Sequence, residues 1–207
     1  YSKCYKRMTW KTVDEVIDYY KELIAEVQYN GEPSELYDPI NYIMSLGGKR
    51  LRPVLVGLGN DLFGGNPKEA DSIAKSIEIF HNFTLLHDDI MDKAPLRRGM
   101  ATVHEKWNDN IAILSGDVML IKVYEEILKG EYSNTIELVK ILNQTAIEVC
   151  EGQQLDMNFE TQDYVEVDEY INMIKLKTSV LLGAALKMGA VSAGAKDKEA
   201  EKLYEFG

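Results

Sequence analysis

The apolar residues of this chain recur at helical spacing, and no stretch of useful length alternates between apolar and polar side chains as a half-buried strand would. Near the N-terminus, Val13, Val16, Ile17, Tyr20 and Ile24 follow the i, i+3, i+4, i+7 pattern of an amphipathic helix. The pattern predicts an all-α helical bundle in one domain. The expected helices lie within residues 10–27, 38–48, 52–65, 67–93, 108–129, 134–159 and 167–190.

Proline and glycine set several of the expected boundaries. Pro39 is expected to open the helix within 38–48, and Gly47–Gly48 to end it. Asn66 as N-cap and Pro67 in the first turn open the longest helix, which should run to about Lys93. That helix would be about 26 residues, or roughly 40 Å, long.

Composition narrows the classes of partner and compartment. The chain has 207 residues and a net charge of -11, which argues against a nucleic-acid partner, because such a partner requires a basic face. Its two cysteines, Cys4 and Cys150, give no disulfide framework and no metal knuckle, which fits a cytoplasmic protein. No signal peptide is visible, and no apolar run approaches the ~18 residues of a transmembrane helix.

An acidic cluster stands at the expected C-terminal end of the longest helix. Asp88 and Asp92 lie one turn apart on one face, with Asp89 beside them and His81 on nearly the same stripe. Carboxylates at a helix C-terminus are disfavoured by the helix dipole unless a cation is present. A pair of hard oxygen ligands suits Mg²⁺, whereas a solvated acidic helix end is the plainer alternative.

Basic side chains occur on both sides of this cluster. The stretch "GGKRLRP" (47–53) places Lys49, Arg50 and Arg52 at a helix start after two glycines, an arrangement that can seat a phosphate group. Arg97 and Arg98 follow the aspartates. A solvated basic turn, or charge neutralisation in an acidic protein, would explain either group alone.

Further motifs follow along the chain, at "GD" (116–117), "GQQLD" (152–156) and "KT" (177–178). Taken in order with "GGKRLRP", "HNFTLLHDDIMD" and "LRRG", they resemble the trans-isoprenyl diphosphate synthases (polyprenyl synthetases). The resemblance implies a helical bundle of the isoprenoid synthase type with a central active-site cavity. It also implies a cytoplasmic homodimer.

The resemblance implies a Mg²⁺-dependent prenyltransferase that condenses isopentenyl diphosphate with an allylic diphosphate (dimethylallyl, geranyl or farnesyl). Ionisation of the allylic bond, attack by the isopentenyl double bond and loss of a proton need charge stabilisation and exclusion of water. The implied catalytic residues are Asp88, Asp92, Arg97 and Lys177, and the implied metal ligands Asp88, Asp89 and Asp92. The implied seat for the diphosphate of isopentenyl diphosphate consists of Lys49, Arg52, His81 and Arg98, and Arg97 is implied to bind the allylic diphosphate. The remaining implied substrate-binding residues, which would line the reacting region, are Gln153, Asp156, Lys177 and Thr178.

Chain length is expected to depend on Phe83 and Thr84, five and four residues before Asp88. In the family these positions line the pocket for the growing tail, and an aromatic residue at Phe83 resembles the enzymes with short products. The expected product is C15 to C20, with C20 favoured by the two-residue spacer of "DDIMD". A longer-chain polyprenyl diphosphate synthase is the alternative, and so is a Phe83 that only fills the core.

One departure from the family pattern is large. The chain ends at "LYEFG" (203–207), where the stretch before the second aspartate-rich motif would begin, so truncation and loss of activity are expected. Three other classes of protein share part of this pattern. An HD-type metal phosphohydrolase needs a second metal-binding histidine well upstream, but the only upstream histidine, His81, is on the same expected helix. A non-catalytic subunit usually degrades the aspartate motif, which is complete here, and a terpene cyclase has no use for "GGKRLRP".

Overall fold

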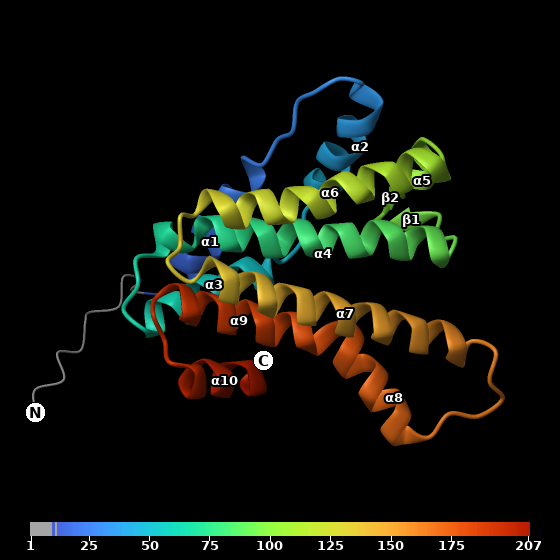
Figure 1. The fold of residues 1–207 in the computed structure, drawn as a ribbon. Helices are drawn as coiled ribbons and strands as arrows, with labels where there is room; N and C mark the ends of the chain where they lie inside the picture. Colours follow the sequence, from blue (N-terminus) through green and yellow to red (C-terminus); the bar gives the residue numbers. More distant parts are fainter. Residues whose placement is uncertain (1–9, 11) are drawn as a thin grey trace, which may run out of the picture. The chain divides into compact units, whose positions relative to one another are not determined.

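The computed structural model describes residue 10 and residues 12–207, and it confirms the expected all-α fold (Figure 1). Cys4 lies outside the described residues, and Cys150 is an exposed free thiol. No helix in the described part of the chain has both the length and the apolar character that crossing a bilayer requires. The α-helices are α1 (Val13–Ala25), α2 (Ser34–Ser45), α3 (Leu51–Leu62), α4 (Asp71–Met91), α5 (Val103–Lys106), α6 (Asp109–Lys129), α7 (Thr135–Phe159), α8 (Val167–Ile174), α9 (Val180–Ser192) and α10 (Asp197–Phe206).

The described chain forms two compact units. The N-terminal unit contains residues 12–54 and 71–130, and the C-terminal unit contains residues 55–70 and 131–207. That the whole sequence forms one domain stays a prediction.

In the N-terminal unit, α4 packs along α6, and α1, α2 and α5 contact these two helices. Each helix buries an apolar stripe, as the periodicity predicts, and α6 also leaves several large apolar side chains exposed. The completely buried side chains of this core include Tyr20, Ile24, Ile40, Ile43, Ile73, Ile77, Phe80, Met119 and Ile127.

In the C-terminal unit, α9 is apolar on almost every side and is buried by α7, α10 and part of α3. Glycine allows the closest of these contacts. A Cβ atom on Gly59 would collide with the backbone of Leu186, and one on Gly189 with the backbone of Val56. These two glycines therefore let α3 and α9 approach at backbone distance.

Several expected boundaries were wrong. Pro39 does not open α2, which begins at Ser34 after an extended Pro33, so Pro39 lies inside the helix. Residues 67–70 form a 3₁₀ turn (η1, Pro67–Ala70) before α4, which shortens the long helix to 21 residues.

Several elements were not expected at all, among them the short helix α5. Leu96–Arg97 (β1) and Met100–Ala101 (β2) form a minimal antiparallel hairpin, too short for any alternation to be visible in the sequence. The expected helix 167–190 is interrupted by a π-helical turn (η2, Lys175–Ser179). The charged segment after residue 196 forms α10, whose Ala200 is buried.

Candidate active site

The acidic cluster lies where the sequence predicted it, at the C-terminal end of α4. Asp88 is half-buried and Asp92 exposed, and the Asp92 N–H donates to the Asp88 carbonyl at 2.9 Å. The N–H of Lys93, whose φ is 49°, donates to the backbone carbonyl of Ile90, and the N–H of Ala94 donates to the backbone carbonyl of Asp89. These bonds form a Schellman motif, which makes Asp92 the C-cap and fixes both carboxylates at the helix end.

Asp89 has a different environment from its two neighbours. Its side chain is only 3% exposed and accepts three hydrogen bonds from the Arg97 guanidinium, of 2.7 to 3.0 Å. The hydrogen bonds to Asp89 hold the pKa of Arg97 above its ordinary value, against the effect of burial, and the charges of Asp88 and Asp92 act in the same direction. The bidentate pair therefore anchors Arg97 beside the other two aspartates.

The hairpin β1–β2 separates two arginines that are adjacent in sequence. Arg98 and Gly99 have φ values of 55° and 81°, which makes them the two central residues of a type I′ turn. Arg97, in the strand, turns to Asp89, whereas the guanidinium of Arg98 lies against Gly48. A Cβ atom on Gly48 would stand 2.8 Å from the Arg98 Nη1, so a side chain there would displace Arg98.

Arg98 thereby completes a second cluster, the basic pocket, with a volume of about 350 Å³. The loop between α2 and α3 enters it through Gly47 and Gly48, whose φ values of 75° and 138° favour glycine. The structure thus brings together the residues that the sequence assigned to one diphosphate seat. The pocket is lined by Gly48, Lys49, Arg50, Leu51, Arg52, Glu78, His81 and Arg98.

His81 contributes to this pocket as a neutral ring. Burial and the charges of Arg52, Arg98, Arg97 and Arg50 lower the pKa of His81 to about 2. The Arg52 Nη1 lies 3.1 Å from the His81 Nε2, and an arginine can only donate, so Nε2 accepts and Nδ1 carries the proton. His81 therefore orients Arg52.

The donor set of the pocket fits an anion. Burial lowers the pKa of Arg52, which remains a cation under all ordinary conditions. Within the described residues, its buried Nε has no hydrogen-bond partner. A phosphate oxygen would satisfy this donor.

One residue that lines the pocket, Glu78, was missed as a functional candidate. Glu78 and Arg50 form a buried ion pair with an Nη1–Oε1 distance of 2.5 Å. The sequence placed Arg50 among the cations of the predicted phosphate seat, whereas Glu78 looked like any acidic residue of an amphipathic helix. Its position three residues before His81, on the same face of α4, was the available signal.

The residues assigned to chain length lie on α4 between the two clusters. Phe83 is half-buried, and its ring centroid is 4.7 Å from that of His87 and 5.8 Å from that of Phe80. Thr84 uses its hydroxyl locally, donating to the His81 carbonyl at 2.8 Å. Gly116 on α6 is needed because a Cβ atom there would collide with the His87 ring.

The remaining candidates belong to the C-terminal unit. Lys177 Nζ and Asp156 Oδ2 are 2.5 Å apart, so α7 and the π-helical turn are joined by an ion pair. Gly152 makes this possible, since a Cβ atom there would collide with the backbone of Lys177. Gln153 is buried on α7 and Thr178 is exposed in the turn. A π-helical turn is frequent at functional sites because it re-aims side chains.

The metal prediction can be compared with the donors present. Among the residues that the structure describes, no three acidic, histidine or cysteine side chains gather as a ready-made metal site. Mg²⁺ does not require one, because it binds through one or two carboxylates and completes its shell with phosphate oxygens and water. Asp88 and Asp92 supply such a pair, whereas Asp89 is occupied by Arg97.

The chain is similar in sequence and in fold to known prenyl diphosphate synthases. A geranylgeranyl diphosphate synthase from Methanosarcina mazei is 45% identical over 177 residues, which cover 84% of this chain and 55% of the relative. A crystal structure of a geranylgeranyl pyrophosphate synthase matches with a TM-score of 0.90 and 50% identity, over 95% of this chain and 60% of the other.

A more distant structure carries ligands. The polyprenyl synthase from Caulobacter crescentus, complexed with calcium and isoprenyl diphosphate, matches with a TM-score of 0.84 and 27% identity, over 94% of this chain and 60% of the other. This chain thus spans about 55 to 60% of the length of the relatives it matches. The polyprenyl synthetase family model covers residues 33–207, and the chain therefore belongs to the polyprenyl synthetase family.

Proposed function

We propose that this chain carries the diphosphate-binding part of a short-chain trans-prenyltransferase, which joins isopentenyl diphosphate to an allylic diphosphate. The observation that carries the proposal is the division of the N-terminal unit into two charged clusters. One has three aspartates and Arg97, and the other is the basic pocket with Arg98. Two diphosphates of different identity require two such seats.

The basic pocket is the proposed seat of isopentenyl diphosphate. Lys49 and Arg98 are exposed at the pocket, and Arg52 offers a donor without a partner among the described residues. His81 keeps Arg52 in place through its Nε2. This seat binds its ligand by direct charge and needs no metal.

The aspartate cluster is the proposed seat of the allylic diphosphate, with Asp88 and Asp92 as ligands of Mg²⁺. Bound Mg²⁺ would stabilise charge on the leaving diphosphate. Asp89 belongs to the same motif but acts through Arg97, which it holds ready for a diphosphate oxygen. We propose that Gln153, Asp156, Lys177 and Thr178 line the reacting region, as their positions in the family motifs indicate.

The proposed product is C15 to C20, with Phe83 and Thr84 at the floor of the tail pocket. Phe83 supports this because its half-buried ring is held between the rings of Phe80 and His87. The names of the relatives agree with a product of about this length. A longer-chain product remains the second candidate.

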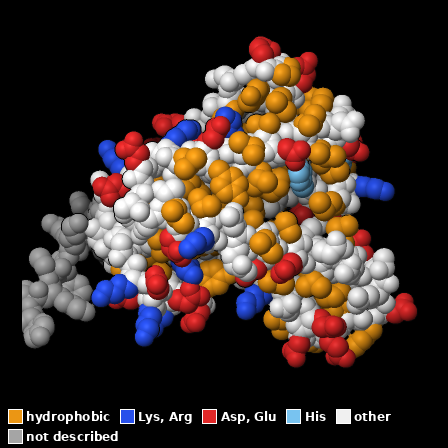
Figure 2. Space-filling model, in the orientation of Figure 1, with side chains coloured by type: hydrophobic (Ala, Val, Ile, Leu, Met, Phe, Trp, Pro, Cys, Tyr) orange, Lys and Arg blue, Asp and Glu red, His pale blue; other side chains and the backbone are white. Residues whose placement is uncertain are grey.

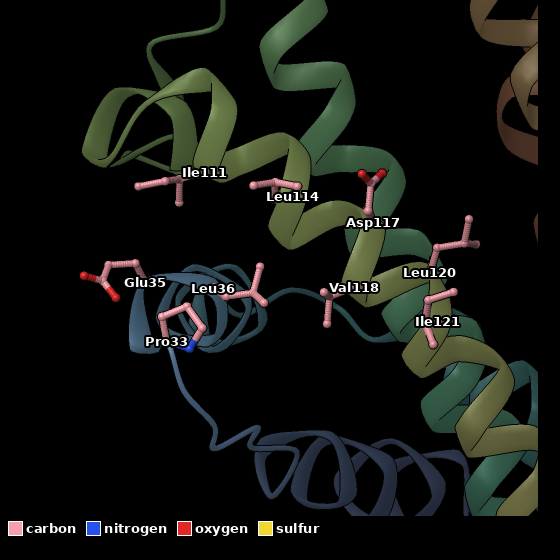
Figure 3. Close-up of a pocket in the computed structure, with 9 residues that line it drawn as sticks. All are labelled: Pro33, Glu35, Leu36, Ile111, Leu114, Asp117, Val118, Leu120 and Ile121. Carbon is pink, nitrogen blue, oxygen red and sulfur yellow. The ribbon is translucent and has the colours of Figure 1, made fainter.

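We further propose that the cytoplasmic enzyme is a homodimer formed through α6. Leu114, Ile121 and Leu128 recur every seven residues on this helix and are 57 to 63% exposed. A strict seven-residue repeat is typical of helix pairing, and a two-fold axis would pair the stripe with its copy. Figure 2 shows hydrophobic side chains gathered on this side of the molecule. Figure 3 shows the groove of about 530 Å³ that α6 and the start of α2 form there.

The activity is tested with radiolabelled isopentenyl diphosphate, each allylic primer and the full-length protein, followed by mass analysis of the products. Pyrophosphate release that depends on isopentenyl diphosphate supports the proposal. Pyrophosphate release from the allylic substrate alone would indicate a cyclase, and release of inorganic phosphate a phosphohydrolase. Sedimentation of the wild type and of Ile121→Lys tests the dimer, since only the wild type should sediment as one.

A further inference from the structure

Glu78 is the one carboxylate among the described residues that line the basic pocket. Its side chain is 3% exposed on α4, and its Oε1 accepts from the Arg50 Nη1 at 2.5 Å and from the Asn82 Nδ2 at 3.3 Å. A carboxylate in a pocket that binds anions repels the ligand. Its presence therefore calls for a physical explanation.

Arg50 lines the pocket, but both of its terminal guanidinium nitrogens are already bound within the protein. Its Nη1 is bound to Glu78, and its Nη2 donates to the Met44 carbonyl at 2.6 Å. The side chain is 7% exposed, and the residue has a φ of 51°, in the left-handed region. Arg50 therefore fixes the turn between Gly48 and α3, from which Lys49 and Arg52 project, and Glu78 neutralises its buried charge.

We propose that Glu78 is a built-in counter-ion of the basic pocket, which positions Arg50 and limits the affinity of the pocket for diphosphate. The inference builds on the proposed function of this pocket. A pocket that receives a new diphosphate in every elongation cycle must also release anions. A fixed internal carboxylate offsets part of the charge of the four cations, so that the pocket does not bind the anion too tightly.

The field of Glu78 reaches the residues that would hold the ligand. It raises the pKa of Arg52 and of Arg98, in each case against a larger lowering caused by burial. Replacing this charge by a neutral group of the same shape leaves the cations in place and removes one repulsive charge. Anion affinity should then rise by about three- to tenfold at moderate salt.

The experiment measures binding of inorganic pyrophosphate to the wild type and to Glu78→Gln by calorimetry, with EDTA present so that no divalent metal takes part. The expected result is a dissociation constant about three- to tenfold lower for Glu78→Gln. The variant should also have a lower Tm without ligand and a larger rise in Tm when pyrophosphate is added, because the anion replaces the missing counter-charge. Equal or weaker binding by Glu78→Gln would overturn the proposal.

Two matched variants separate charge from packing. Glu78→Asp keeps the charge and should bind within about twofold of the wild type, and tighter binding there would show that volume matters instead. Glu126→Gln removes another buried carboxylate, paired with Lys129 on α6, and should leave pyrophosphate binding unchanged. If Glu78→Gln is unfolded without ligand, pyrophosphate should restore cooperative unfolding, and failure to do so counts against the proposal.

Kinetics distinguish this inference from the proposed function. If the chain is a prenyltransferase, Glu78→Gln lowers the KM for isopentenyl diphosphate more than the KM for the allylic substrate. If no condensation is found but the pyrophosphate result holds, the counter-ion role stands and only the assigned reaction fails.

Discussion

The two charged regions of α4 balance their charges in opposite ways. At the helix end, three carboxylates share one arginine, and that arginine is used by Asp89. In the basic pocket, four cations share one carboxylate, and that carboxylate is used by Arg50. Each region thus uses one ion pair to build itself and keeps an excess of one sign for a ligand. On the proposed function, the acidic region would require a cation before it could accept a diphosphate, whereas the basic region would not.

Loss of a metal ligand should have the largest effect. Asp88→Ala is expected to reduce turnover by about a thousandfold or more, since charge stabilisation by a metal contributes several kcal/mol. Steady-state turnover with saturating Mg²⁺ is the measurement. Asp163→Ala, an exposed loop aspartate, is the control and should be unaffected. Turnover of Asp88→Ala within about threefold of the wild type would contradict the metal-binding role proposed for the acidic region, and with it the contrast between the two regions.

Arg52→Ala tests the other region. The KM for isopentenyl diphosphate should rise by about ten- to a hundredfold, because a charge-assisted contact is lost, while the KM for the allylic primer stays within about threefold. Lys140→Ala removes an exposed cation of α7 and controls for net charge. A larger change for the allylic primer would show that the two substrates are assigned to the wrong regions.

Phe83 lies on α4 between the two regions, so removing its ring should change the proposed tail pocket and leave the proposed diphosphate seats intact. Phe83→Ala should lengthen the main product by at least one isoprene unit, because one helical turn spans about 5.4 Å. Product analysis by mass spectrometry decides this. An unchanged product at good activity would place the floor of the tail pocket elsewhere. Wild-type products of C30 or longer would end the short-chain proposal.

The smallest expected effect concerns the neutral ring of His81. Its pKa is about 2 in the folded chain, below the ordinary 6.5, so below about pH 6.5 the unfolded chain binds a proton that the folded chain does not. The free energy of unfolding should therefore fall as pH decreases, by up to about 1.4 kcal/mol per pH unit from this group. Urea unfolding between pH 7.5 and 5 measures the slope.

His81→Asn should make that slope shallower. His87→Asn, which removes another histidine of α4, is the matched variant. If the slope of His81→Asn equals that of the wild type, His81 is not a buried neutral ring, and the orientation inferred for Arg52 is wrong.

The sequence was sufficient to predict the long helices and most of the residues that meet in the basic pocket. Periodicity predicted long amphipathic helices because each of them buries one stripe. Motif order placed Lys49, Arg52, His81 and Arg98 in one seat, and the structure brings them to one pocket. The assigned roles and the Mg²⁺ ligands stay predictions.

What the sequence could not predict depends on contacts between distant residues. The π-helical turn packs closely against Gly152 of α7, a contact between distant residues that local propensity does not encode. The Glu78–Arg50 pair spans 28 positions, and an acidic residue on a helix gives no local sign that it is buried. Helix α10 has few apolar residues in a mostly charged segment, so its pattern was too short to be recognised, and it packs on α9.

The hairpin directs two arginines that are adjacent in sequence, Arg97 and Arg98, to different partners. Arg97 pairs with Met100 at the end of the strand, whereas Arg98 is the first central residue of the turn, so the partner of each arginine depends on its place in the hairpin. Inserting or deleting one residue between Pro95 and Gly99 should move at least one of the two arginines away from its present partner. This short segment should therefore accept substitutions more readily than changes in length.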